Sequence, residues 1–292
     1  MNLSVDRQMD EYVSYVEQYL KENCFAYDDQ PQALLFEAMR YSLLAGGKRL
    51  RPVLVFDFCR MCGGNWKDAA PFAMAIEMIH TYSLIHDDLP CMDNDDYRRG
   101  MPTNHKVYGE AIAVLAGDAL LTAAFSFISK APFSAEVRIK AVEYLAEAAG
   151  ELGMVGGQVL DISSEERECT HQEIIDIQSR KTGALIRAAC VLGVLAGNGS
   201  AEQIKAATAF ADNLGLAFQI RDDMLDVIGN AKTLGKSTGT DATKNTFVSL
   251  LGIDKCDALV KQHTQYAISA LNAFPDRQFM ESLSKSLTNR NK

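Results

Sequence analysis

No proline stands between Pro132 and Pro275, and this long span is rich in residues that favour the α-helix. Ala, Leu, Glu, Lys and Gln all have high helix propensity. The seven prolines lie at positions 31, 52, 71, 90, 102, 132 and 275, mostly where a helix would begin or end. Strand-type alternation is absent. The sequence therefore predicts an all-α fold, a bundle of about ten or more helices.

Glycines and a capping pattern mark where one of these helices restarts. Residues 197–200 read Gly-Asn-Gly-Ser, and Ser200 and Gln203 have the spacing of a capping box, which predicts a helix through about Ile228. No linker or low-complexity tract divides the chain, which predicts a single domain over residues 1–292. Three segments are apolar on more than one face and are expected in the middle of the bundle: Phe72–Asp88, Ala111–Lys130 and Leu214–Val227.

The overall composition limits the partners and the compartment. The chain has 292 residues, of which 48% are hydrophobic, so a substantial core is available. A net charge of −9 and an isoelectric point near 5.1 argue against nucleic acid or an anionic membrane as a partner. No signal-like segment opens the chain, and Asp118 interrupts the best candidate for an apolar run of about 18 residues. A cytoplasmic protein without a membrane anchor is expected.

The seven cysteines are odd in number and scattered, which is typical of a reducing compartment. Cys59 and Cys62 have the spacing of a metal-binding or redox pair. No second pair or histidine follows at zinc spacing, so we expect them to be two small core residues on a helix.

The acidity of the chain is local. Two short segments hold eight aspartates: Asp87, Asp88, Asp93, Asp95 and Asp96 in the first, and Asp222, Asp223 and Asp226 in the second. Without these eight, the remaining 30 acidic residues nearly balance the 29 basic ones. The negative charge therefore describes two sites and not the whole surface.

The first cluster lies where a helix is expected to end. Pro90 disfavours the helical conformation in the residue before it, so the helix should end near Asp88, and Asp93 should return from the following loop. His80 and Ser83 lie seven and four residues before the first aspartate, on the same helical face. This face is therefore polar at its end and continues into an apolar bundle.

The second cluster places three carboxylates on one helical stripe, because Asp226 follows Asp222 by four residues and Asp223 by three. Like charges at this spacing repel one another and cannot be buried without a counter-charge. One interpretation is a solvated acidic helix end, and the other is a site for a hard cation. Mg²⁺ prefers a few carboxylates, several waters and substrate phosphates, whereas the loop that Ca²⁺ would require is absent. The two clusters together favour magnesium.

A site for metal and phosphate also requires basic residues, although each of these alone is more typical of a solvated surface. The candidates are Lys48, Arg51, Arg98, Arg99, Lys181, Lys236 and Lys244. Two glycine-rich segments, 46–49 and 229–237, resemble a nucleotide P-loop but have the wrong spacing or lack its Ser/Thr. An ATPase is therefore disfavoured.

Six motifs in order resemble those of the trans-isoprenyl diphosphate synthases, most closely the bacterial-type farnesyl diphosphate synthases. The two aspartate-rich motifs are Asp87-Asp88-x4-Asp93, followed by Arg98-Arg99-Gly100, and Phe218-Gln219-x2-Asp222-Asp223-x2-Asp226. The other four are Gly46-Gly47-Lys48-Arg49-x-Arg51-Pro52, Gly156-Gly157-Gln158-x2-Asp161, Lys181-Thr182-Gly183 and Gly235-Lys236. The resemblance extends over essentially the whole chain.

The resemblance implies an all-α bundle around a deep central cavity, usually a homodimer, with the two aspartate motifs facing each other at its mouth. It also implies about three Mg²⁺ ions that bridge carboxylates to the diphosphate of an allylic substrate. Loss of this diphosphate gives an allylic cation, which the double bond of isopentenyl diphosphate attacks. Loss of a proton then gives a product five carbons longer.

The resemblance also implies a role for each matched residue. The metal ligands would be Asp87, Asp88, Asp93 and Asp222, supported by Asp223 and Asp226. The allylic diphosphate would be held by Arg98, Lys181, Thr182, Gln219, Lys236 and Lys244, and isopentenyl diphosphate by Lys48, Arg51, His80 and Arg99. The segment from Asp241 to Lys244 is shorter than in many relatives. The general base is not evident from the residue types, and in the family this role is usually assigned to the released diphosphate.

Product length is expected to depend on the residues one turn below the first motif, where Tyr82 and Ser83 stand. An aromatic residue at Tyr82 resembles the farnesyl pattern, in which bulk forms a floor under the growing chain. The alternative is an ordinary core aromatic. A geranylgeranyl product is the nearest rival. A class I terpene cyclase would need Ser/Thr where Asp226 stands and Glu where Asn230 stands, and a non-catalytic helical subunit would be expected to lack metal ligands.

Overall fold

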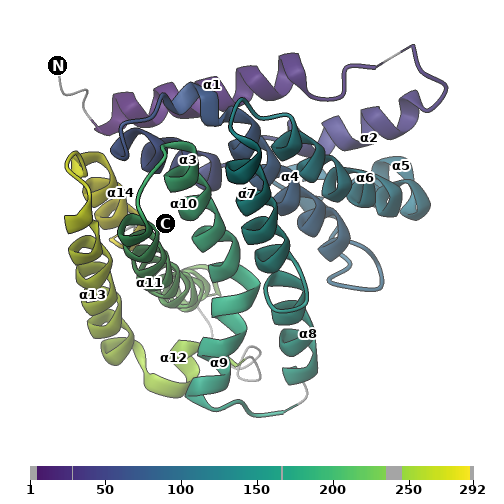
Figure 1. Ribbon diagram of the computed structural model, residues 1–292. Coiled ribbons are helices and arrows are strands. Elements are labelled where there is room, and N and C mark those ends of the chain that lie inside the picture. The colour runs from purple at the N-terminus through teal and green to yellow at the C-terminus, as the bar shows by residue number, and fades with distance from the viewer. Residues whose placement is uncertain (1–4, 28, 166, 235–244, 290–292) are drawn as a thin grey trace. The chain divides into compact units, whose positions relative to one another are not determined.

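The computed structural model describes residues 5–27, 29–165, 167–234 and 245–289, and over these residues the chain is almost entirely helical (Figure 1). It forms two compact units. The first consists of Met1–Glu143 with Leu195–Asn198, and the second of Tyr144–Val194 with Gly199–Lys292. The predicted all-α fold is confirmed.

The first unit contains six complete helices among its described residues. They are α1 (Val5–Asn23), α2 (Ala33–Leu43), α3 (Leu50–Met61), α4 (Ala70–Asp87), α5 (Asn104–Tyr108) and α6 (Glu110–Ser129), with a 3₁₀ turn at Trp66–Ala69. Helix α7 (Ala135–Ala149) begins in this unit and ends in the second.

The second unit continues with α8 (Met154–Ser164), α9 (His171–Gln178) and a π-helical turn at Ser179–Gly183. Helix α10 (Ala184–Ala196) follows, and its last two residues belong to the first unit. The second unit ends with α11 (Ala201–Leu234), α12 (Phe247–Leu251), α13 (Ile253–Ala270), a 3₁₀ turn at Leu271–Ala273, and α14 (Gln278–Thr288).

Helix α4 lies at the centre of the first unit, as its composition predicts. Almost every residue from Ala70 to Tyr82 is buried, and α4 packs against both α3 and α6. It ends at Asp87, as Pro90 predicts, and the Asp93 amide donates a hydrogen bond to the Asp87 carbonyl at 2.8 Å. The loop therefore folds back under the helix end.

Helix α6 differs from the prediction of a fully central position. It buries a stripe of small residues but exposes Val114 and Leu115, which are 39% and 52% accessible. Among the described residues it is also the one helix whose length and apolarity would allow it to cross a membrane, and a third of its apolar window (33%) is buried. A core helix can also meet this criterion. Helix α6 thus has one packed face and one uncovered apolar face.

The long helix of the second unit begins as predicted and ends later. The Ser200 amide donates to Gln203 Oε1 at 2.9 Å, and the Gln203 amide donates to Ser200 Oγ at 3.2 Å, which forms the capping box. Helix α11 then extends to Leu234, beyond the expected end near Ile228. Gly229 and Asn230 follow Ile228 and are residue types that often end a helix, but the helix continues through them.

A short hairpin was not predicted from the sequence. Strand β1 (Tyr97–Arg98) pairs antiparallel with β2 (Met101–Pro102), and the two are joined by Arg99 and Gly100. Both turn residues have positive φ, of 54° and 78°, as a tight hairpin turn requires. Two-residue strands are too short to show alternation, so the strand pattern could not reveal them.

Cys59 and Cys62 are core residues at the end of α3. Cys59 is fully buried, and burial raises the pKa of its thiol to about 12 and that of Cys62 to about 11. A Cβ atom on Gly197 would lie 2.5 Å from that of Cys62, so the backbone packs directly on the pair. Raised thiol pKa values oppose metal binding and redox reactivity, which favours the structural interpretation.

Candidate active site

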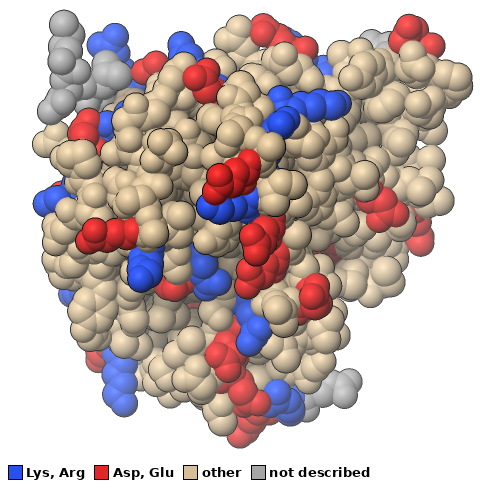
Figure 2. Space-filling model, in the orientation of Figure 1, with Lys and Arg blue, Asp and Glu red and all other residues tan. Residues whose placement is uncertain are grey.

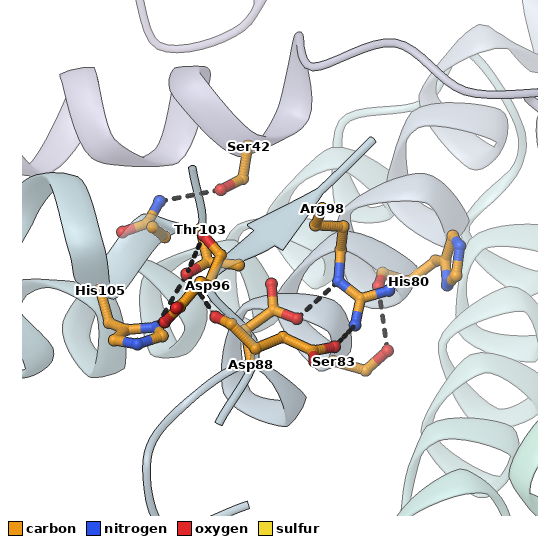
Figure 3. A network of polar contacts seen from close by, with 10 residues as sticks. Ser42, His80, Ser83, Asp88, Asp96, Arg98, Thr103 and His105 are labelled. Atoms are coloured by element: carbon orange, nitrogen blue, oxygen red, sulfur yellow. Dashed lines mark hydrogen bonds and ion pairs between the residues drawn. The ribbon is translucent and has the colours of Figure 1, made fainter. Parts of the chain in front are cut away.

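The end of α4 carries the first aspartate motif, and its most buried carboxylate is paired with an arginine. Asp88 is 3% exposed, and its Oδ1 accepts a hydrogen bond from Arg98 Nε at 2.6 Å (Figure 3). Burial raises the pKa of Asp88, while Arg98 acts in the opposite direction. Arg98 also reaches Asp95 at 3.3 Å. The hairpin thus positions one basic residue directly on the carboxylate cluster.

The hairpin is held by a network around Thr103, which Figure 3 shows beside Asp88. The Thr103 amide donates to the Asp96 carbonyl at 3.0 Å, and its hydroxyl donates to the Asp95 carbonyl at 2.8 Å. Asn104 donates from Nδ2 to Ser42 Oγ on α2 at 2.8 Å. These contacts fix the loop that carries Arg98, and sequence reasoning did not identify them.

The second arginine of the hairpin lies against the glycines before α3. Arg99 donates a hydrogen bond from its guanidinium to the Gly46 carbonyl. A Cβ on Gly47 would lie 2.8 Å from the Arg99 guanidinium carbon, and Gly47 has φ of +133°. Glycine at this position therefore allows both the backbone conformation and the close approach of the arginine.

Arg49 and Arg51 stand two residues apart and differ in their contacts. Arg49 is 2% exposed and forms ion pairs of 2.6 Å with Glu17 on α1 and with Glu77 on α4. It therefore ties three helical segments together. Arg51 has a buried Nε without a hydrogen-bond partner. The two arginines thus have different surroundings, although they stand two residues apart.

Arg51, Arg99 and His80 form a positively charged region. Burial lowers the pKa of Arg51, the charge of Glu77 raises it, and the charge of Arg99 lowers it again. Burial also lowers the pKa of His80 well below its ordinary value, followed by the effects of Arg51 and Arg99. His80 is therefore neutral near pH 7. Clustered cations of this kind favour the binding of an anion.

Tyr82 and Ser83, which were predicted to limit product length, lie on α4 about one turn before Asp87. Tyr82 is 6% exposed, and burial, followed by the charge of Asp87, raises the pKa of its hydroxyl to about 12. Ser83 donates from its hydroxyl to the His80 carbonyl at 2.9 Å, so its polar group is satisfied within the helix. Tyr82 therefore adds bulk and no charge below the aspartates.

The second aspartate motif lies on α11, as predicted. Asp223 turns toward α12, where its Oδ2 accepts a hydrogen bond from the Phe247 amide at 2.8 Å. Burial raises the pKa of Asp223 to about 6, with the Phe247 amide lowering it and Asp226 raising it. Asp222 is half-buried and Asp226 is exposed. Asp223 is thus tied to the protein, whereas Asp226 faces solvent.

Lys181 and Thr182 lie on the π-helical turn between α9 and α10. Lys181 Nζ pairs with Asp161 Oδ2 on α8 at 2.5 Å. Gly157 on α8 allows this approach, since a Cβ there would lie 2.2 Å from the Lys181 amide nitrogen. Asp161 belongs to a motif recognised in the sequence, but its pairing with Lys181 was not predicted. π-Helical turns are frequent at functional sites.

Gln219 lies one turn before Asp222 on α11 and donates from Nε2 to Gln178 Oε1 at 2.6 Å. Lys236 and Lys244 lie outside the described residues. Asn245 follows directly and is held in place, since its Oδ1 accepts from the Cys169 amide at 2.9 Å and its Nδ2 donates to the Ser164 carbonyl at 2.9 Å. This anchor was not identified from the sequence.

Charge on the described surface is interspersed. On the face shown in Figure 2, acidic and basic side chains alternate over a mostly uncharged surface. Within the described part of the chain, no three His, Cys, Asp or Glu side chains are close enough to form a complete metal site. The two aspartate motifs lie in different units.

The chain is similar to known proteins over most of its length. The Polyprenyl synthetase family profile matches residues 32–280. The farnesyl diphosphate synthase of Micrococcus luteus is 47% identical over 264 residues, which cover 89% of this chain and 91% of that protein. A chloroplastic heterodimeric geranylgeranyl pyrophosphate synthase large subunit of Arabidopsis thaliana is 49% identical, covering 82% of this chain and 67% of that protein.

A solved structure agrees with the sequence comparison. The crystal structure of an FPP/GFPP synthase from Zymomonas mobilis matches with a TM-score of 0.89 and 36% identity, covering 99% of this chain and all of that one (100%). The helical architecture is therefore shared with this synthase. This chain belongs to the polyprenyl synthetase family.

Proposed function

We propose that this protein is a magnesium-dependent prenyltransferase that joins dimethylallyl or geranyl diphosphate to isopentenyl diphosphate and releases farnesyl diphosphate. The observation that carries the proposal is the region formed by Arg51, Arg99 and neutral His80. It brings two arginines, one with a buried Nε that has no hydrogen-bond partner, together with this histidine in the same unit as the Asp87–Asp93 motif. An anion site beside a carboxylate cluster suits a substrate that carries diphosphate and a metal that binds it.

The carboxylates fit a hard divalent cation by their donor chemistry. Asp87 and Asp93 are joined through a backbone hydrogen bond, and Asp88 already has a cationic partner in Arg98. These three, together with Asp222 and with support from Asp223 and Asp226, would hold about three Mg²⁺ ions. Bound magnesium would neutralise charge on the departing diphosphate.

The basic residues are assigned to the two substrates. Lys48, Arg51, His80 and Arg99 would hold isopentenyl diphosphate, and Arg98, Lys181, Thr182, Gln219, Lys236 and Lys244 would hold the allylic diphosphate. With both substrates oriented, the allylic carbon–oxygen bond breaks and the diphosphate leaves. The isopentenyl double bond forms the new carbon–carbon bond, and a proton is lost from the isopentenyl unit. Orientation of the two reactants is the main contribution of these side chains.

A fifteen-carbon product is proposed because Tyr82 places a buried aromatic ring five residues before Asp87. The similar proteins include farnesyl and geranylgeranyl synthases, so similarity alone does not select a length. A growing chain that runs along α4 from Asp87 would meet this ring. A ring that blocks further growth would end elongation at farnesyl diphosphate.

The test is turnover by the purified protein with Mg²⁺, geranyl diphosphate and isopentenyl diphosphate, with products identified by mass spectrometry. Farnesyl diphosphate is expected, and chelation of the metal should abolish its formation. A twenty-carbon product would overturn the product length. Absence of turnover with every allylic diphosphate would overturn the enzyme assignment.

Tyr82→Ala tests the floor directly. It should shift the product mixture toward twenty carbons, because the ring that ends elongation is removed. Tyr82→Phe is the matched control: it keeps the ring and loses the hydroxyl, so it should still make farnesyl diphosphate. Equal product lengths in all three proteins would remove Tyr82 from this role.

We also propose that the two units act as one domain over residues 1–292, that the protein is a homodimer, and that it works in the cytoplasm. The family profile spans both units, which supports a single domain. Helix α8 exposes Val155, Val159 and Ile162 (45%, 58% and 47%) at helical spacing, and such a stripe is typical of an interface.

Light scattering tests the oligomeric state. The wild-type chain should have the mass of a dimer, and Val159→Asp should lower it toward that of a monomer. Tyr266→Asp is the matched control, since Tyr266 is similarly exposed (51%) but belongs to another helix, α13. A monomeric wild type would overturn the proposal.

A further inference from the structure

His86 stands on α4 directly before the first aspartate motif, and it contacts both α6 and an earlier turn of α4. Its Nε2 lies 3.1 Å from the Val114 carbonyl on α6. A carbonyl can only accept, so Nε2 carries the proton and donates this hydrogen bond. The same ring meets Tyr82, one turn earlier on α4, in an edge-on arrangement with centroids 5.7 Å apart and an interplanar angle of 74°. His86 therefore lies between α6 and the proposed floor residue.

Gly117 is what allows His86 to reach the α6 backbone. A Cβ atom at Gly117 would lie 2.1 Å from His86 Nε2 and 2.5 Å from its Cδ2. Gly117 is not among the glycines with positive φ, so its backbone conformation does not itself require glycine. It follows Val114 by three residues, and its missing side chain opens the path to that carbonyl. The glycine is therefore matched to the histidine ring.

We infer that His86 is a positioning residue that sets product length by fixing the ring of Tyr82. The inference rests on the proposed function, in which Tyr82 is the floor. The hydrogen bond to Val114 holds the imidazole against α6, and the edge-on contact then prevents the Tyr82 ring from moving toward that helix. The position of the floor thus depends on two residues, Tyr82 and His86, of which only Tyr82 was identified from the sequence.

Two variants should move the floor in opposite directions. His86→Ala removes the support of Tyr82, so the share of twenty-carbon product should rise about tenfold. Gly117→Ala drives the imidazole toward Tyr82, so elongation of geranyl diphosphate should slow about tenfold while elongation of dimethylallyl diphosphate changes little. The shorter substrate ends further from the floor.

The double variant His86→Ala/Gly117→Ala is the internal control. Removing the ring also removes the clash with the new methyl group, so the double variant should give the product ratio of His86→Ala alone. His86→Phe separates the ring from the hydrogen bond. It retains an aromatic support and should stay closer to the wild-type ratio than His86→Ala does.

The experiment measures the ratio of ten-, fifteen- and twenty-carbon products, together with kcat/KM for each allylic substrate and the melting temperature of each variant. If the wild type makes the fifteen-carbon product and both His86→Ala and Gly117→Ala keep its product ratio, this inference alone is overturned. Wild type without any prenyl product would overturn the proposed function and this inference with it. If Gly117→Ala does not fold, the comparison of His86→Ala with His86→Phe decides: equal, wild-type ratios in both overturn the inference.

Discussion

Arg98 donates from Nε to the buried carboxylate of Asp88 at 2.6 Å, which pairs a proposed diphosphate-binding residue with a proposed metal ligand. Asp88 is 3% exposed, so its charge is shielded from water and depends on this partner. The first unit therefore balances part of its own acidic motif in the absence of any ligand.

Arg98→Gln should lower the free energy of unfolding by about 1–3 kcal/mol, because it leaves a buried carboxylate without its charged partner. Urea denaturation in the presence of a chelator measures this loss. Lys106→Gln, which removes the exposed ion pair with Asp96, should have a clearly smaller effect. The double variant Arg98→Gln/Asp88→Asn should recover much of the loss. Equal losses for Arg98→Gln and Lys106→Gln would contradict the interpretation.

Arg49 and Arg51 should respond differently to the same substitution. Arg49→Gln leaves Glu77, which is 2% exposed, without its partner and should cost about 3–5 kcal/mol of stability. Arg51→Gln should cost far less stability than Arg49→Gln, because Arg51 Nε has no hydrogen-bond partner and the repulsion of Arg99 opposes the attraction of Glu77. It should instead raise the KM for isopentenyl diphosphate about tenfold or more. A strongly destabilised Arg51→Gln variant with unchanged KM would reverse these roles.

The carboxyl of Asp223 predicts a pH dependence of the metal-free protein. Its pKa of about 6 in the folded chain lies above the ordinary 3.8, so the folded state binds this proton more tightly than the unfolded state. This stabilisation is complete below pH 3.8 and is lost as the pH rises toward 6. Asp223→Asn should therefore be more stable than wild type at pH 8, by about 2 kcal/mol, and should lose this advantage at pH 4.

Thermal unfolding at the two pH values, in the presence of a chelator, tests the effect of Asp223. Asparagine can still accept the hydrogen bond from Phe247, so the contact itself is kept. The same stability difference at pH 4 and pH 8 would show that the carboxyl charge is not its cause.

Alanine substitutions at Gly157 and Gly215 compare a tightly packed glycine with a loosely packed one. Gly157→Ala places a methyl group 2.2 Å from the Lys181 amide nitrogen, against backbone that cannot move aside, and should cost about 1–3 kcal/mol. Gly215→Ala meets nothing closer than 3.6 Å and should stabilise helix α11 by up to about 1 kcal/mol. Denaturant titration compares the two, and a stable Gly157→Ala variant would show that α8 can shift away from the π-helical turn.

Local sequence signals predicted one end of each of the two helices that carry the aspartate motifs. Pro90 determined the end of α4, and the pair Ser200 and Gln203 determined the start of α11. In both cases the residues that give the signal lie within a few residues of the helix end. Such signals act through backbone conformation, which neighbouring side chains largely control.

Contacts over long sequence separations could not be predicted in this way. Arg49 and Arg51 are the same residue type, and they differ because Glu17 and Glu77, which lie 32 and 28 residues from Arg49, pair with Arg49. The hydrogen bond of His86 to α6 likewise depends on Gly117, a residue that no motif includes. The family resemblance named the residues of the site, whereas the structure shows which of them hold the protein together.

The π-helical turn at Ser179–Gly183 has a consequence for redesign and ancestry. It acts as a one-residue insertion in a helix that would otherwise run unbroken from α9 into α10. A turn that is wider by one residue absorbs this residue locally, so α9 and α10 keep the faces that they would have in an unbroken helix. Deleting one residue there would therefore restore that helix and leave Ile174 and Ile177 in their buried positions. The lysine-bearing turn can thus be gained or lost without changing the packing of the helices on either side.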